Sequence, residues 1–164
     1  MSKIFPYKSI LIVCSVNSAR SCMAEGFLRE FFSRKELAIE VNSGGVASNA
    51  RDGMLISVDA KDAMQEIGIK LSDTSKSVEL KTKRHRELIK NADLILALTK
   101  RHKEEIMKFE EANNKIILTI KEFAGENGDI EDPSMKGIAG FRVARDAIIE
   151  CLNRGLEKYD LKID

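Results

Sequence analysis

The 164-residue sequence has few of the side chains that bind metals or build disulfide frameworks, with three cysteines and two histidines. No two cysteines form a CxxC pair, and no group of histidines and cysteines has the spacing of a metal site. A small, odd number of cysteines predicts free thiols, which are typical of a reducing cytoplasm. We therefore expect a cytoplasmic protein without metal or cofactor, with His85 and His102 at the surface.

Long apolar runs and an excess of one charge are also absent. No stretch approaches the ~20 apolar residues of a membrane span, and residues 1–8 lack the apolar core of a secretory signal. The 27 Lys and Arg residues nearly balance the 26 Asp and Glu residues, giving a formal net charge of +1. This balance argues against a nucleic-acid-binding protein, and the basic segment 81–86 is typical of a solvated helix face. We expect neither nucleic acid nor membrane as a partner.

Short apolar runs alternate along the chain with amphipathic stretches, and one domain of residues 1–164 accounts for the length. The expected strands are 9–13, 37–41, 92–99 and 115–120, and the expected helices are 23–32, 58–67, 100–111 and 138–159, with 78–90 helical in part. Residues 43–45 predict a turn near the end of the second strand. Strands separated by helices indicate an α/β fold with a four-stranded parallel sheet covered by helices on both faces.

The most informative segment is Cys14-Ser15-Val16-Asn17-Ser18-Ala19-Arg20-Ser21. It joins an apolar run to an amphipathic stretch, and a loop of this length can wrap a tetrahedral oxyanion with its backbone N–H groups and the next helix N-terminus. That positive field also favours the thiolate of Cys14, while Arg20 can hold two oxygens of the anion in a fork. A cysteine after a strand is most often a small buried hydrophobe. The combined context instead indicates a phosphate loop with Cys14 as the nucleophile.

A proton donor for such a site is expected on the loop 122–137, because that loop follows the fourth strand and ends at the same edge of the sheet as Cys14. A thiolate that attacks a phosphorylated side chain needs an acid for the leaving group and later a base for water. Asp132 is our candidate, since Pro133 stiffens the loop and favours an extended conformation at the preceding residue. Asp129 and Glu131 remain alternatives.

These motifs, taken in order along nearly the whole chain, resemble the low-molecular-weight protein-tyrosine-phosphatase family. The resemblance rests on Cys14-x5-Arg20-Ser21, Met23-Ala24-Glu25, Ser43-Gly44, the segment 92–97 and Asp132-Pro133. It implies hydrolysis of phosphorylated proteins or peptides through a phosphocysteine on Cys14, with Arg20 as the phosphate clamp and Asp132 as acid and then base. Phosphate, vanadate and sulfate are the expected loop ligands, and a monomer or weak dimer is expected.

The resemblance also implies how the loop is held. Ser21 would hydrogen-bond to the thiolate, and Asn17 would adopt a left-handed conformation fixed by Ser21 and Ser43. The residues implied to bind phosphate are Ser15, Val16, Asn17, Ser18, Ala19, Ser21 and Ser43. Several positions depart from the family pattern: Val16 stands where glycine is usual, Ala19 where many members have a second cysteine, Cys22 where proline is common, and Asp73 where a histidine helps fix the asparagine.

The substrate class depends on the rim of the site. Phosphotyrosine enzymes of this family resemble one another in carrying aromatic residues after the Asp-Pro pair, where this chain has Ser134 and Met135. They also tend to carry Ile or Leu at the position of Ser18. A hydroxyl residue there resembles the bacterial protein-arginine phosphatases of the same family. The sequence leaves phosphoarginine and phosphotyrosine open.

Three other functions remain as alternatives. Arsenate reduction on the same fold needs further thiols, for which only Cys22 and Cys151 are available. A phosphocysteine carrier would need neither Arg20 nor Asp132, so both residues argue against it. An inert oxyanion-binding module would be indifferent to loss of the thiol. Whether Cys22 forms a protective disulfide with Cys14 on oxidation is also open.

Overall fold

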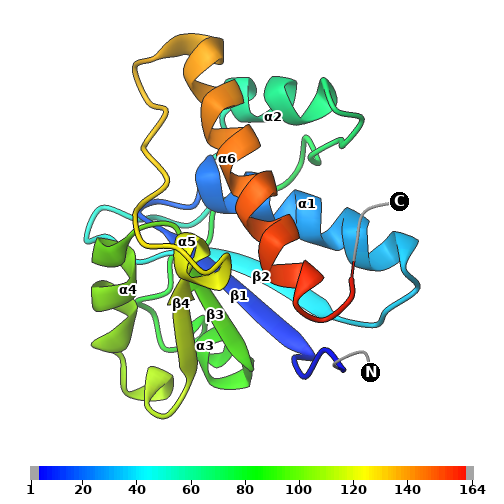
Figure 1. Cartoon of the computed structure of the whole chain (residues 1–164). Coiled ribbons are helices and arrows are strands. Elements are labelled where there is room, and N and C mark those ends of the chain that lie inside the picture. Colours follow the sequence, from blue (N-terminus) through cyan, green and yellow to red (C-terminus); the bar gives the residue numbers. More distant parts are fainter. Residues whose placement is uncertain (1–3, 162–164) are drawn as a thin grey trace.

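The structure is a computed structural model that describes residues 4–161 (Figure 1). Its elements are β1 (Ser9–Cys14), α1 (Arg20–Arg34), β2 (Glu40–Gly45), α2 (Val58–Gln65), α3 (Arg86–Asn91), β3 (Leu94–Ala97), α4 (Lys100–Met107), the 3₁₀ helix η1 (Glu110–Ala112), β4 (Ile116–Thr119), α5 (Ile120–Phe123) and α6 (Gly137–Glu157). In this part of the chain the four strands form one parallel sheet in the order β2-β1-β3-β4. The predicted α/β fold is confirmed.

Strand β1 is central because its apolar residues can be buried on both faces of the sheet. Ile10 and Ile12 pack with α1 and α6, whereas Leu11 and Val13 pack on the opposite face with residues of α3 and α4. Successive side chains of a strand point to opposite faces, so a continuous apolar run suits a sheet with two covers. Figure 1 shows α1 and α6 above the sheet and α3 and α4 on its other side.

The second strand lies later in the chain than its sequence pattern predicts. The segment 43–45, expected as a turn, continues β2 beside β1, with Gly44 opposite Val13 and Gly45 opposite Cys14. A Cβ atom on Gly44 would meet the Leu80 side chain at 2.6 Å, and one on Gly45 would meet the Ser15 carbonyl oxygen at 2.8 Å. These glycines therefore let Leu80 and the backbone at Ser15 approach β2 closely, and the turn prediction is wrong.

Other differences concern the ends of helices. In the segment 78–90 only the last part is helical, from Arg86 on, so the basic cluster is not a helix face. Two of its side chains instead bond to backbone carbonyls: Lys81 Nζ donates to the Ser48 carbonyl and Arg86 Nε to the Lys81 carbonyl. The loop 122–137 begins inside α5, and Thr119, just before this helix, forms a capping box with Glu122.

Of the helices in residues 4–161, none has the length and apolarity that crossing a bilayer requires.

Backbone pairing brings two distant segments to the carboxyl end of β1. The Leu98 N–H donates to the Val13 carbonyl at 3.1 Å, and the Ile130 N–H donates to the Leu98 carbonyl at 3.0 Å. The segment that contains Asp132 is therefore tied to the edge at which Cys14 lies. Ligands of parallel α/β sheets bind outside this edge.

Candidate active site

Cys14 is the last residue of β1, and its sulfur is the floor of the loop that leads to α1. The Ser21 hydroxyl lies 2.9 Å from Sγ, and the Asn17 backbone N–H donates to Sγ at 3.2 Å. The residue is 3 % exposed. Two polar groups, one from the loop and one from α1, therefore hold the sulfur of Cys14 at the carboxyl end of β1.

The N-terminus of α1 supplies donors and positive charge to the same loop. Ala19, at the N-cap, has no side-chain oxygen to accept from the first turn, and no acidic residue lies in that turn. The helix's own hydrogen bonds start with the Met23 N–H donating to the Ala19 carbonyl. The preceding N–H groups thus have no partner within the helix and lie at its positive end, which is an anion-binding arrangement.

Asn17 holds the loop in shape. It has a φ of 62° and is 2 % exposed. Its amide group donates to the Ser21 hydroxyl at 2.9 Å and to the Ser43 hydroxyl at 2.8 Å, and its oxygen accepts from the Val78 N–H at 2.8 Å. The expected contacts of Asn17 to Ser21 and Ser43 are present, and the Val78 N–H adds a third contact, to the side-chain oxygen of Asn17.

Ser43 carries this network one step further. Its hydroxyl donates to the Glu25 carboxylate, which also pairs with Arg29 at 2.7 Å. Burial raises the pKa of Glu25, although the hydrogen bond from Ser43 and the charge of Arg29 oppose that effect. The sequence pattern singled out Glu25 only as part of a motif. Asp73, aligned with a family histidine, is not among the hydrogen-bond partners of Asn17 in the described residues and instead lies 3.6 Å from Lys61.

The departure from the family pattern at Val16 is compatible with the loop, because the left-handed residue is Asn17 and not Val16.

Ser18 is half-buried, and its carbonyl accepts from the Ser57 N–H at 2.8 Å, which ties the loop to the start of α2. Cys22 donates from its thiol to the Asn17 carbonyl at 3.4 Å, and burial raises the pKa of this thiol. All three cysteines are free.

Arg20 is buried at the start of α1 and turned toward the Asp132 segment. Its Nη1 donates to the Ile130 carbonyl at 2.8 Å, and its Nη2 lies 3.9 Å from the Asp132 carboxylate. The side chain is 8 % exposed, whereas that of Asp132 is 59 % exposed. A guanidinium anchored through one nitrogen leaves the rest of its fork for an anion.

Asp132 is the only one of the three candidate acids that faces this guanidinium. Asp129 accepts from the Lys100 N–H at 2.8 Å, at the start of α4, and Glu131 pairs with Lys136 at 3.1 Å. Burial raises the pKa of Asp132, but hydrogen bonds from Ser134 and the charge of Arg20 outweigh it and leave the pKa below its ordinary value. The carboxyl is therefore ionised in the ligand-free protein.

His102, expected at the surface, is buried beside the loop, so that expectation is wrong. It is 4 % exposed, and its Nε2 lies 2.7 Å from the Ser15 hydroxyl oxygen. The Thr99 hydroxyl accepts from the His102 N–H and caps α4, which fixes the residue in the first turn. The spacing of His102 and the buried Ile106 on one face of α4 was the available sequence signal. His85 is half-buried.

His85 belongs to the one group that has metal-ligand chemistry among residues 4–161, together with Asp52 and Glu79. Its ligand atoms lie within 4.8 Å of one another. The atoms are engaged in holding a turn: Asp52 accepts from the Glu79 N–H, Glu79 accepts from the Lys81 N–H, and His85 Nδ1 lies 2.9 Å from the Glu79 carbonyl. This arrangement explains the cluster without an ion.

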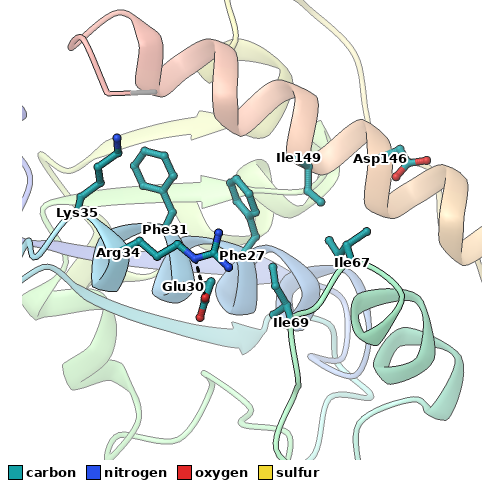
Figure 2. Close-up of a pocket in the computed structure, with 9 residues that line it drawn as sticks. All are labelled: Phe27, Glu30, Phe31, Arg34, Lys35, Ile67, Ile69, Asp146 and Ile149. Carbon is teal, nitrogen blue, oxygen red and sulfur yellow. Dashed lines mark hydrogen bonds and ion pairs between the residues drawn. The ribbon is translucent and has the colours of Figure 1, made fainter. Parts of the chain in front are cut away.

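An apolar groove of about 370 Å³ lies away from the loop, between α1 and α6 (Figure 2). Phe27, Phe31, Ile67, Ile69 and Ile149 form its apolar surface, and charged side chains surround it. None of its lining residues carries a thiol, hydroxyl or imidazole, so the groove offers no counterpart to the chemistry of Cys14.

Comparisons with known proteins agree with this geometry. Residues 9–162 match the family described as "Low molecular weight phosphotyrosine protein phosphatase". A protein-arginine-phosphatase of Geobacillus stearothermophilus is 38% identical over 156 residues, covering 93% of this chain and 96% of the relative. The protein-arginine-phosphatase of Bacillus subtilis is 32% identical over 147 residues, covering 88% and 92%.

Solved structures are similar over the same extent. A YwlE arginine phosphatase mutant with a phosphorylated active-site serine has a TM-score of 0.79 and 34% identity, covering 92% of this chain and 93% of that one. A low molecular weight protein tyrosine phosphatase from T. tengcongensis has a TM-score of 0.80 and 32% identity, covering 92% and 98%. Because sequence and fold agree from the phosphate loop to the last helix, the chain belongs to the low molecular weight phosphotyrosine protein phosphatase family.

Proposed function

We propose that this phosphatase hydrolyses phosphoarginine in proteins in two steps, through a phosphocysteine on Cys14. Arg20 and the loop amides bind the phosphoryl group, and Asp132 transfers protons. The observation that carries the proposal is the convergence of three groups at one strand end: a sulfur that accepts from the Asn17 N–H, the Arg20 guanidinium, and the Asp132 carboxylate 3.9 Å from that guanidinium.

In the first step the Cys14 thiolate attacks phosphorus in line with the leaving nitrogen. The S–P bond forms, the P–N bond breaks, and the electron pair of that bond stays on the guanidine nitrogen, which takes a proton from Asp132. Charge in such transition states is spread over the three equatorial oxygens. The fork of Arg20 and the first N–H groups of α1 are the donors for those oxygens.

Asp132 must be protonated for this step, although its pKa is below the ordinary value in the ligand-free protein. A phosphoryl dianion between Arg20 and Asp132 changes that balance. The dianion partly neutralises the positive charge of the Arg20 guanidinium and repels the Asp132 carboxylate. Both effects raise the pKa of Asp132. Asp132 therefore becomes protonated when substrate binds.

In the second step a water molecule attacks the phosphocysteine. The Asp132 carboxylate takes a proton from this water, the O–P bond forms, and the S–P bond breaks to return the Cys14 thiolate and release phosphate. The Ser21 hydroxyl, 2.9 Å from Sγ, stabilises the thiolate as it leaves.

The choice of phosphoarginine rests on the rim of the site and on the relatives. Ser134 and Met135 follow the Asp-Pro pair, so no aromatic ring is available there to hold a phenyl group. Ser18 offers a hydroxyl that can accept from a guanidinium N–H. Two curated relatives that cover most of the chain are protein-arginine-phosphatases.

The test compares rates on a phosphoarginine peptide and a phosphotyrosine peptide of the same sequence. The wild-type protein should prefer phosphoarginine, and Ser18→Ile should move the preference toward phosphotyrosine, with Ser33→Ala as a control serine on the far part of α1. A preference for phosphotyrosine in the wild type would refute the substrate assignment alone. Full activity of Cys14→Ser on both peptides would refute the mechanism.

The arsenate-reductase alternative gains no support from the geometry. It needs a relay of thiols, and Cys151 is buried on α6 at 2 % exposure, packed into the core. Cys22 bonds to Asn17 and its pKa is raised by burial, so it remains a thiol.

A further inference from the structure

The pair formed by His102 and Ser15 has no part in the mechanism above. His102 Nε2 lies 2.7 Å from Ser15 Oγ, and the ring is 4 % exposed. Its other nitrogen, Nδ1, is buried without a hydrogen-bond partner among the described residues. A buried imidazole that keeps one polar atom unpaired is costly, and such a group needs a functional or structural reason.

The surroundings of the ring place it next to the phosphate site. The charged groups that act on it are Arg20, Asp129, Arg101 and Asp132. Burial, followed by the positive charge of Arg20, lowers the pKa of His102 to about 4, and the two carboxylates only partly oppose this. The ring is therefore neutral near pH 7, with one N–H.

The unpaired Nδ1 indicates which nitrogen carries that hydrogen. An orphaned N–H in a protein interior is rarer than an acceptor that lacks a donor. Hydrogen on Nε2 leaves only a lone pair unpaired at Nδ1, whereas hydrogen on Nδ1 would leave a buried donor unpaired. In the favoured form the Nε2–H donates to Ser15 Oγ.

This direction fixes the role of the serine hydroxyl. Ser15 Oγ accepts from the imidazole, so its own hydrogen is turned away from the ring and is available as a donor. Ser15 is the first loop residue after Cys14 and is half-buried. In the proposed mechanism the backbone N–H groups of this loop bind the phosphoryl group.

We propose that His102 is a positioning residue that directs the Ser15 hydroxyl hydrogen toward an oxygen of the phosphoryl group in the loop. The inference adds a side-chain donor to the phosphate site and rests on the proposed function for its effect on turnover. Its effect on anion binding is independent of turnover. Glutamine at position 102 can supply an N–H of similar reach, so it serves as the conservative replacement.

The first measurement is the affinity for inorganic phosphate, followed through the amide NMR signals of residues 15–20. A hydrogen bond to a charged group contributes about 1.5–3 kcal/mol, so Ser15→Ala and His102→Ala should each weaken binding about tenfold or more. The double variant should be no weaker than either single one, because both changes remove the same donor. His102→Gln should stay within about threefold of wild type, as should the control Ser33→Ala.

The second measurement reads the ring directly by ¹⁵N NMR of the imidazole at pH 7, where hydrogen on Nε2 is expected. Hydrogen on Nδ1, wild-type phosphate affinity in Ser15→Ala, or additive losses in the double variant would each overturn the proposal. If His102→Ala does not fold, Ser15→Ala and His102→Gln still decide it. Phosphate binding that depends on the pair, in a protein that hydrolyses neither phosphopeptide, would sink the proposed function and leave this inference standing.

Discussion

Replacing Asn17 tests whether the phosphate loop is held by one buried side chain. Asn17→Ala removes hydrogen bonds to Ser21, Ser43 and Val78, each of which contributes ~1 kcal/mol. A left-handed conformation at φ 62° adds ~1 kcal/mol for alanine. The free energy of unfolding should therefore fall by about 4 kcal/mol, measured by urea denaturation with an unchanged m-value.

Two matched variants separate these contributions. Asn17→Gly removes the hydrogen bonds without the left-handed penalty, so it should be about 1 kcal/mol more stable than Asn17→Ala. Asn114 also has a positive φ, of 65°, but is exposed and makes no side-chain hydrogen bond in the described part of the chain. Asn114→Ala should therefore cost only about 1 kcal/mol. A loss at position 17 no larger than that at position 114 would refute the reasoning.

Three further predictions concern the acid, the core and the pH dependence. Asp132→Asn should lower turnover by about 10²–10⁴-fold, and mass spectrometry should detect phosphocysteine if breakdown is slowed. Gly155→Ala should lower the free energy of unfolding by about 1–3 kcal/mol in urea, because its Cβ would lie 2.1 Å from the Phe123 ring. His102 stays neutral in the fold to about pH 4, whereas the unfolded chain is protonated from about pH 6.5. The contribution of His102 to the free energy of unfolding is complete above pH 6.5 and should fall by roughly 3 kcal/mol toward pH 4 in the wild type. His102→Gln should lack this part of the pH dependence.

The parts of the site that follow from local order could be predicted from the sequence. The phosphate loop lies between a buried strand and a helix, so its position in the chain could be predicted from local order, whereas its shape also depends on the bonds from Asn17 to Ser43 and Val78. The topology of parallel sheets, which brings strand ends together, predicts that the loop 122–137 lies near Cys14, and Pro133 makes Asp132 the candidate acid in that loop. The sequence left Asp129 and Glu131 as alternatives, because the contact of Asp129 with the Lys100 N–H at the start of α4 links residues 29 positions apart and has no local signal.

The features that the sequence did not reveal depend on packing between distant elements. His102 stands between Arg101 and Lys103, which indicates an exposed helix, yet its side chain faces Ser15, 87 positions earlier. The glycines of β2 read as a turn because glycine is common in turns. Glycine is needed at these positions because Leu80 and the phosphate loop backbone pack closely against the strand. The spacing of His102 and Ile106 indicates a buried face of α4, but no local pattern encodes which distant residue either segment contacts.

The bond from Arg20 to Ile130 connects segments 110 positions apart through a main-chain oxygen. A carbonyl is present whatever side chain the residue carries, so this anchor tolerates substitution at position 130 as long as the backbone path is kept. Inserting or deleting a residue between 124 and 129 would instead move the oxygen away from the guanidinium. The orientation of the Arg20 guanidinium therefore depends on the length of the segment 124–129 more than on its amino-acid composition.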